Sequence, residues 1–239
     1  MTNQQKTAVI SGGTRGIGLA IATALAGLGY NIATFARTQN QLDAFGGKMD
    51  GLGVKTFSLC GDARDDKFLE KFVVQAISTL GGIKVLINNA GGGKKDNVLD
   101  AKNADWDQIL SVNLRAAMIL TKLVLPELIK SPRSAVINIA SMAGKTGIAG
   151  STAYCASKFG IVGFSHALFE DVRHHGVKVC AICPGYVDTP LIPSRKALIR
   201  EEMIRPEDIA KTVEYVLGTS PSACPVEILL RPQRYPFKQ

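Results

Sequence analysis

The chain has 239 residues, of which 46% are hydrophobic and 6% aromatic, and a formal net charge of +8. That length suits one α/β domain over residues 1–239, and no apolar run reaches the roughly 18 residues that suggest a membrane span. The basic residues are scattered, without an arginine-rich tract or a set of stacking aromatics, which argues against nucleic-acid binding.

Apolar, strand-like runs alternate with helical patterns along the chain. Nearly all-apolar strands in this alternation predict a Rossmann-type α/β fold, a doubly wound seven-stranded parallel sheet with helices on both faces. Gly29 and Gly176 follow helices as C-terminal caps do, and Pro126 is expected to interrupt the longest helical pattern. The strands are expected at 7–11, 31–36, 54–60, 85–90, 134–140, 177–183 and 226–231, and the helices at 17–28, 39–49, 65–80, 104–130, 152–174 and 206–217.

A glycine-rich turn, SGGTRGIG at 11–18, joins the first strand to the first helix. Its spacing is Gly12-x-x-x-Gly16-x-Gly18. Glycine permits unusual backbone dihedrals and close approach of a ligand, and a helix N-terminus attracts anions. The turn therefore predicts a phosphate or pyrophosphate site, with a tight structural turn as the alternative.

Two arginines flank the place where a dinucleotide's ribose would lie. The second strand ends in Arg37, where a carboxylate commonly binds the ribose 2′-hydroxyl, and Arg15 lies inside the glycine turn. Guanidinium groups bind phosphate well, so this pair predicts a 2′-phosphate and hence NADP rather than NAD. The alternative is that both are solvated surface residues.

The five cysteines have no framework spacing. Cys180 and Cys183 are three residues apart on a predicted strand, so they point to opposite faces and are expected to be buried thiols. His174 and His175 close a helix, where cations suit the helix dipole, and no third ligand is evident, so no metal site is predicted. The cysteine usage and the absence of a secretory pattern lead us to expect a cytoplasmic protein.

A tyrosine and a lysine are placed for proton transfer. Tyr154 and Lys158 lie four residues apart in a helical pattern and share one face. A nearby ammonium stabilises a phenolate and lowers the tyrosine pKa from about 10, which improves proton transfer at neutral pH. Ser141 closes the fifth strand, where its hydroxyl can bind a substrate oxygen, and Asn113 lies in a separate long helix. A tyrosine that merely packs over a lysine stem is the alternative.

Together these motifs resemble the short-chain dehydrogenase/reductase family of the small single-domain type, over nearly the whole chain. The resemblance rests on an ordered set: SGGTRGIG at 11–18, Asn88-Asn89-Ala90-Gly91, Asn113, Ser141, Tyr154, Lys158 and Pro184-Gly185-Tyr186-Val187-Asp188-Thr189.

The resemblance implies a role for each catalytic position. Tyr154 would be the general acid in reduction and the base in oxidation, and Lys158 would bind the nicotinamide ribose and lower the tyrosine pKa. Ser141 would orient the carbonyl, and Asn113 would hold a water that links Lys158 to solvent. The cofactor-binding positions that follow from the turn, the arginines and the resemblance are Gly12, Thr14, Arg15, Gly16, Ile17, Gly18, Arg37, Asp62, Ala63, Asn89, Ala90, Gly91, Tyr154, Lys158, Pro184, Gly185, Val187 and Thr189.

The chain also departs from the family pattern. Ser11 replaces the usual threonine, and the short stretch from Thr189 to Arg205 predicts a small substrate lid. The chain ends in PVEILLRPQRYPFKQ, without the Asp-Gly-Gly pattern common in the final strand. By resemblance we expect a homodimer through the long helices or a homotetramer, and the divergent end places the tetramer in doubt.

The sequence thus predicts an NADP(H)-dependent oxidoreductase that interconverts a carbonyl and a secondary alcohol. One candidate substrate is a 3-oxoacyl thioester on an acyl carrier protein, and the other is a small free ketone, aldehyde or sugar. A protein of another class, a sensor or scaffold that binds NADP without turnover, is the remaining alternative.

Overall fold

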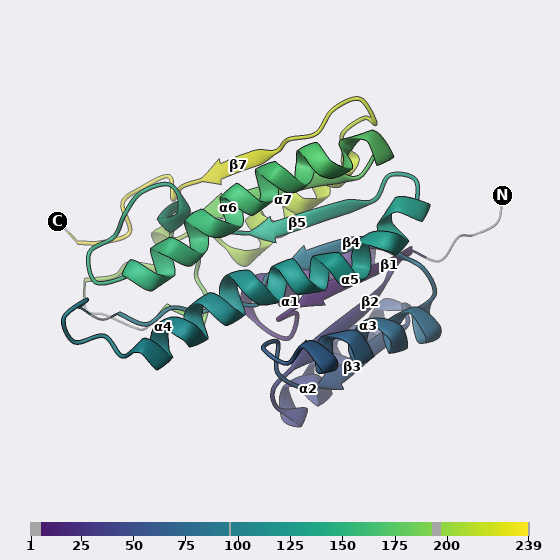
Figure 1. Ribbon diagram of the computed structural model, residues 1–239, viewed down its shortest axis with the longest axis horizontal. Helices are drawn as coiled ribbons and strands as arrows, with labels where there is room; N and C mark the ends of the chain where they lie inside the picture. Colours follow the sequence, from purple (N-terminus) through teal and green to yellow (C-terminus); the bar gives the residue numbers. More distant parts are fainter. Residues whose placement is uncertain (1–5, 96, 193–196, 239) are drawn as a thin grey trace.

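Seven parallel strands form one sheet in the computed structural model, which describes residues 6–95, 97–192 and 197–238. Their order is β3-β2-β1-β4-β5-β6-β7, which confirms the predicted Rossmann-type fold (Figure 1). The strands are β1 (Lys6–Ser11), β2 (Tyr30–Ala36), β3 (Thr56–Cys60), β4 (Ile83–Asn88), β5 (Ala135–Ile139), β6 (Lys178–Pro184) and β7 (Glu227–Leu230). The helices are α1 (Gly16–Gly27), α2 (Gln39–Met49), α3 (Asp66–Leu80), α4 (Asn103–Leu110), α5 (Ala116–Lys130), α6 (Thr152–Val172) and α7 (Pro206–Gly218).

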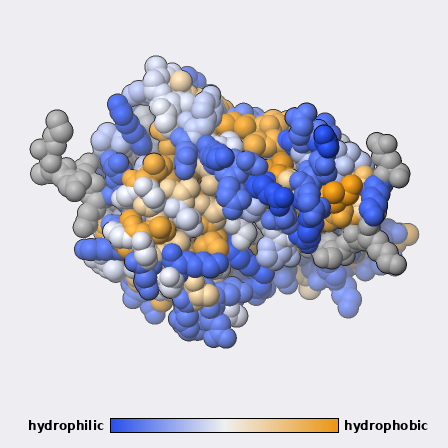
Figure 2. Space-filling model, turned by 180° about the vertical axis from the view of Figure 1, so that it is seen from behind, coloured by the Kyte–Doolittle hydropathy of each residue, from blue (hydrophilic) through white to orange (hydrophobic). Residues whose placement is uncertain are grey.

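Helices cover both faces of the sheet because its central strands are apolar on both sides. Along β1, Ala8 and Ile10 belong to the core beneath α1, α2 and α7, whereas Val9 belongs to the core beneath α3, α5 and α6. The helices α5 and α6 lie in front of the sheet in Figure 1. The opposite side of the molecule is largely hydrophilic, with apolar areas between the polar residues (Figure 2).

The order of the strands places a crevice at the carboxyl ends of β1 and β4. The chain proceeds from β1 to β2 on one side and later resumes at β4 on the other. Loops leaving these two strands diverge to opposite faces, and open α/β sheets bind ligands at such a switch point.

The long helical pattern at 104–130 is interrupted at a different place from the one expected. Pro126 lies inside α5, and the irregularity is a π-helical turn at Ser111–Arg115 between α4 and α5. Pro126 removes the hydrogen bond to the Lys122 carbonyl, but both residues lie on the exposed side of the helix, where water can satisfy that carbonyl. The predicted break at Pro126 is therefore wrong.

The combined helix Asn103–Lys130 is long and apolar enough to cross a bilayer by length and composition. In this fold its apolar side packs in the core, where Leu120, Val124 and Leu128 are buried. Its apolar character is thus accounted for by packing against the sheet.

The two cysteines of β6 face opposite cores, as predicted. Cys180 lies in the core on the α1 side, and Cys183 lies with Ile161 and Val162 of α6. Both thiols are free and buried, and burial raises their pKa to about 12 and about 11, respectively. They remain protonated, which suits a packing role.

Candidate active site

The glycine turn between β1 and α1 requires glycine at two positions for different reasons. Gly12 has a φ of +66°, and a Cβ there would lie 3.1 Å from the Ala90 Cα. A Cβ on Gly18 would overlap the Gly12 carbonyl oxygen, so Gly18 lets α1 start directly under the turn. No side chain caps the N-terminus of α1 and no acidic residue occupies its first turn. This end of the helix is thus suited to an anionic group.

The loop after β4 is bound to the glycine turn. The side-chain amide of Asn89 donates to the carbonyl oxygens of Ser11 (3.2 Å) and Gly12 (2.9 Å). The Ser11 hydroxyl oxygen accepts the backbone N–H groups of Asn89 and Ala90, both at 3.0 Å. The serine that departs from the family pattern therefore keeps the hydroxyl contact that joins the two loops.

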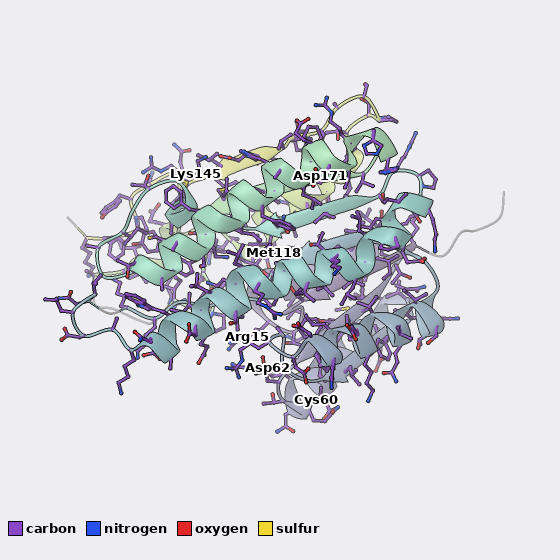
Figure 3. The ribbon with its side chains drawn as sticks, viewed as in Figure 1. Arg15, Cys60, Asp62, Met118, Lys145 and Asp171 are labelled. Carbon is purple, nitrogen blue, oxygen red and sulfur yellow. The ribbon has the colours of Figure 1, made fainter. Side chains whose placement is uncertain are left out.

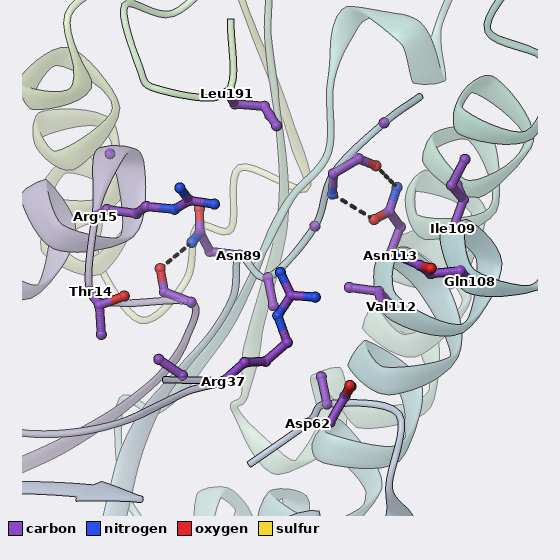
Figure 4. A pocket seen from close by; sticks show the side chains of 18 of the residues that line it. Thr14, Arg15, Arg37, Asp62, Asn89, Gln108, Ile109, Val112, Asn113 and Leu191 are labelled. Atoms are coloured by element: carbon purple, nitrogen blue, oxygen red, sulfur yellow. Dashed lines mark hydrogen bonds between the residues drawn. The ribbon is translucent and has the colours of Figure 1, made fainter. Parts of the chain in front are cut away.

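A cavity of about 360 Å³ opens beside this turn (Figure 4). It runs from the ends of β2 and β3 to the π-helical turn. The predicted cofactor-binding residues that line it are Gly12, Thr14, Arg15, Gly16, Ile17, Arg37, Asp62, Ala63, Asn89, Ala90, Gly91 and Thr189. Those that do not line it are Gly18, Tyr154, Lys158, Pro184, Gly185 and Val187.

Other residues of the cavity wall were missed from the sequence. Gln108 and Ile109 at the end of α4, and Val112 in the π-helical turn, line the cavity together with Asn113. Ile109 precedes Asn113 by four residues, and this helical spacing was the signal that could have identified it. The wall also contains Phe35, Ala36, Gln41, Gly61, Arg64, Gly92, Gly93, Lys94, Asp105, Pro190 and Leu191.

Charges at one end of the cavity are arranged for an anion. Arg15 and Arg37 point into it (Figure 4), and neither guanidinium forms an ion pair within the described part of the chain. Asp62 is held by Arg64, whose Nε lies 3.1 Å from Oδ1 and whose Nη2 lies 2.7 Å from Oδ2. The Arg64 hydrogen bonds hold the pKa of the Asp62 carboxyl below its usual value. Two cations thus remain for a ligand, and one carboxylate has a fixed orientation.

The catalytic residues predicted on β5 and α6 lie together. Ser141 follows β5 and hydrogen-bonds the Tyr154 hydroxyl, and the Ser141 Oγ also accepts the Ala143 N–H at 3.1 Å. Lys158 lies one helical turn from Tyr154, with its Nζ 5.8 Å from the centroid of the tyrosine ring. The same Nζ donates to the Ile139 carbonyl oxygen at 2.8 Å. Ser141, Tyr154 and Lys158 therefore form one cluster at the carboxyl end of β5.

Burial has the larger influence on both ionisable groups of this cluster. It raises the pKa of Tyr154 above 10, and the hydrogen bond from Ser141 lowers it only in part. Burial also lowers the pKa of Lys158 to about 8. The direction for Tyr154 is opposite to the lowered pKa expected from the sequence, because a buried phenolate loses more solvation than the neighbouring groups return.

Asn113 and the loop after β4 connect the cluster to the cavity. The Asn113 side chain donates to the Gly92 carbonyl at 2.8 Å and accepts the Gly92 N–H at 2.9 Å. A Cβ on Gly91 would lie 3.1 Å from Asn113 Oδ1 and 3.7 Å from Lys158 Nζ. A Cβ on Gly93 would lie 3.0 Å from a ring carbon of Tyr154. This loop therefore forms the boundary between the cavity and the Ser141–Tyr154–Lys158 cluster.

The segment after β6 approaches the same cavity from the other side. Pro184 ends β6, Gly185 and Val187 follow it, and Val187 forms a parallel bridge with Ile204. Thr189 lies against Gly16, since a Cβ on Gly16 would meet its methyl group at 3.3 Å. Of this segment, Thr189 is the predicted residue that reaches the cavity wall.

A family model described as short chain dehydrogenase matches residues 6–198. The chain belongs to this family. Its curated relatives include the monensin polyketide synthase putative ketoacyl reductase of Streptomyces virginiae, which is 36% identical over 188 residues, 78% of this chain and 72% of that protein. The 3-oxoacyl-[acyl-carrier-protein] reductase FabG of Staphylococcus aureus is 27% identical over 221 residues, 88% of this chain and 90% of that protein.

Solved structures of the family are similar over nearly the full length. A metagenomic short-chain oxidoreductase in complex with NADP has a TM-score of 0.83 and 31% identity, covering 97% of this chain and 99% of that one. A single-residue variant of actinorhodin polyketide ketoreductase with NADPH has a TM-score of 0.88 and 28% identity, covering 95% of each chain. Several neighbours thus contain NADP or NADPH.

Among the residues that the structure describes, no group of three His, Cys, Asp or Glu side chains is placed to hold a metal ion. His174 and His175 lie in the short 3-10 turn that follows α6, with ring centroids 3.8 Å apart and ring planes inclined at 45°.

Proposed function

We propose that this short-chain dehydrogenase is an NADP(H)-dependent reductase that converts a carbonyl group to a secondary alcohol. The observation that carries the proposal is the juxtaposition of the Ser141–Tyr154–Lys158 cluster with a cavity. That cavity has a glycine turn at one side, and at its end two arginines that form no ion pair with any described residue. The relatives described as ketoacyl reductases support the same reaction.

The residues of the cavity fit a phosphorylated dinucleotide. The glycine turn and the uncapped start of α1 suit the pyrophosphate, and Arg15 and Arg37 suit a 2′-phosphate. Asp62, whose carboxylate is held by Arg64, would meet the adenine. When bound, the reduced nicotinamide supplies the hydride.

The remaining chemistry is proton transfer and charge stabilisation by this chain. Tyr154 has a raised pKa and is protonated at neutral pH, the form that donates its hydroxyl proton to the carbonyl oxygen. Ser141 donates a hydrogen bond to the same oxygen, and the Lys158 ammonium stabilises the phenolate left behind. Asn113 holds the Gly91–Gly93 loop against the cluster. It would also hold a water that links Lys158 to solvent and so relays a proton back to the site.

The proposed substrate is a 3-oxoacyl thioester on an acyl carrier protein, as the functions of the relatives suggest. Lys95 and Lys102 are exposed on the segment that leads from the cavity to α4, where they would face an acidic carrier. Small free ketones, aldehydes or sugars are the second candidate. NADPH consumption over matched panels of acyl thioesters and free carbonyls separates the two, and we expect salt to weaken only the carrier-borne reaction.

The enzyme assignment predicts the effect of Tyr154→Phe. Removing the hydroxyl should lower NADPH-dependent reduction by about 10²–10⁴-fold, because the proton donor is lost. NADPH binding, followed by fluorescence titration, should be nearly unchanged, because the ring and Lys158 remain. A wild-type protein that binds NADPH tightly and reduces no carbonyl would instead support the sensor or scaffold.

We also propose that the protein acts in the cytoplasm, as expected from the sequence, and that of the homodimer and homotetramer expected by resemblance it forms the homodimer.

A further inference from the structure

The C-terminal segment, residues 231–238, runs back along the chain that follows β6. Leu198 and Phe237 form an antiparallel bridge, so the segment adds backbone pairing beyond β7. Two hydrogen bonds flank that bridge: the Ile199 N–H donates to the Pro236 oxygen (2.9 Å) and the Lys238 N–H donates to the Ala197 oxygen (2.8 Å).

Side chains reinforce this contact. The Phe237 ring meets the Tyr186 ring edge-on, with centroids 5.1 Å apart. Pro236 is buried, and Pro232 lies against Gly185, whose Cβ would come within 3.0 Å of the proline ring. The segment therefore contacts both Gly185-Tyr186, directly after β6, and the stretch at 197–199.

Arg200, which directly follows this stretch, is hydrogen-bonded to the segment that forms the cavity wall. Arg200 hydrogen-bonds the Asp188 carboxylate, and its Nη2 donates to the Ile192 carbonyl at 2.8 Å. These two partners bracket residues 189–191, which line the cavity, and Thr189 lies against Gly16. A continuous set of contacts thus leads from Phe237 to the wall at 189–191.

We propose that the C-terminal segment positions this wall for cofactor binding, with Phe237 as the positioning residue. The C-terminal segment holds residues 197–199 and thereby positions Arg200. Arg200 in turn holds Asp188 and Ile192, which lie on either side of the 189–191 wall. The inference rests on the proposed function, because it places NADPH in the cavity. The wall lies against Gly16 at the proposed pyrophosphate site, and the resemblance to the family implies that Thr189 faces the nicotinamide. Arg37 and Asp62 are proposed to bind the adenosine half, so the segment acts on the other half of the cofactor.

The test is Phe237→Ala, with NADPH and 2′,5′-ADP titrated into the same protein. Losing the aromatic contact should weaken NADPH about two- to tenfold and leave 2′,5′-ADP unchanged, because the latter lacks the nicotinamide half. Phe237→Tyr should restore NADPH affinity because it keeps the ring. Lys238→Ala is the matched control, since it removes an exposed side chain and keeps the backbone bond.

Hydrogen exchange in the cofactor-free protein provides a second readout. Phe237→Ala should speed exchange of the Ile199 amide, and Phe237→Leu serves where the alanine variant folds poorly. Equal weakening of NADPH and 2′,5′-ADP, or unchanged NADPH affinity despite faster exchange, would overturn the inference. A wild-type protein that binds no NADPH overturns the proposed function itself, and the inference with it.

Discussion

At the scale of single residues, burial shifts the pKa values of Tyr154 and Lys158 in opposite directions. Burial raises the pKa of the phenol and lowers that of the ammonium, so each is held nearer its neutral form. The phenol is then ready to donate a proton at neutral pH, but the charge that stabilises its anion depends on Lys158 staying protonated. The two groups therefore set different limits on activity.

This difference predicts the alkaline limb of the pH profile for reduction. Lys158 has a pKa of about 8, so kcat/KM should fall as pH rises through about 8, approaching tenfold per pH unit. Burial raises the pKa of Tyr154 above its ordinary value, so the loss of its proton contributes only a decline at higher pH. A profile at saturating NADPH measures this, and a rate that stays level to pH 10 contradicts the role given to the Lys158 charge.

The arginines of the cavity predict cofactor preference. Arg37→Asp should weaken NADPH about 10- to 100-fold, because a charge-assisted contact to the 2′-phosphate is replaced by repulsion, while NADH should change little. Arg64→Gln is the matched control in the same cavity, since Arg64 is engaged with Asp62. It should weaken NADPH and NADH by the same factor. Equal losses for both cofactors in Arg37→Asp count against the 2′-phosphate contact.

At the scale of elements, the π-helical turn at Ser111–Arg115 determines what Asn113 can reach. A π turn contains one extra residue, which rotates the part of the helix after it relative to the part before it. Such turns are frequent at functional sites. Here it accompanies a buried Asn113 whose amide donates to both the Gly92 carbonyl and the Ser157 hydroxyl. At Gly92, the loop after β4 is thus held by the Asn113 side chain.

Asn113→Asp tests this contact. The carboxylate can still accept the Gly92 N–H but cannot donate to the Gly92 carbonyl, so the free energy of unfolding should fall by about 2 kcal/mol. Urea melts at an unchanged m-value would measure the loss. Asn97→Asp is the control, because the exposed Asn97 side chain accepts a hydrogen bond from the Leu99 N–H, and a carboxylate can do the same. Equal stability of both variants would show that the loop does not depend on the Asn113 amide.

The periodic parts of the fold could be predicted from the sequence, and the irregular parts could not. All seven strands are predicted within a few residues because buried parallel strands are continuous apolar runs, as at β5 and β6. The π turn has no recognisable apolar pattern in the sequence. Pro126 wrongly suggested a helix break, because the Lys122 carbonyl that it leaves without a helical hydrogen bond faces solvent.

The catalytic cluster could be predicted from spacing, but its electrostatics could not. Helical spacing places Tyr154 and Lys158 on one face, as the structure has them. The pKa of Tyr154 depends on how deeply the fold buries it, which no local spacing reveals. The path of residues 231–238 was equally hidden, because a bridge between Leu198 and Phe237 joins distant parts of an irregular chain.

At the scale of the whole molecule, apolar side chains remain exposed on the outer side of the long helices. Met118 of α5 is 43% exposed and Phe159 of α6 is 47% exposed. Met118 is labelled on the outward side of α5 in Figure 3, and a Cβ on Gly163 of α6 would meet nothing within 4 Å. A second copy of this chain is the occupant proposed for this face, in keeping with the dimer expected by resemblance.

The dimer predicts the effect of the double variant Met118→Asp/Phe159→Asp. Burying two unpaired carboxylates in a self-complementary interface is costly, so sedimentation should shift from about twice 25.5 kDa to 25.5 kDa. Tyr215→Asp is the control, because Tyr215 is 62% exposed on α7, which covers the other face of the sheet. If Tyr215→Asp dissociates the protein and the double variant does not, the copies meet through α7. A wild-type chain that sediments as a monomer would exclude either arrangement and leave the Ser141–Tyr154–Lys158 cluster to function within one chain.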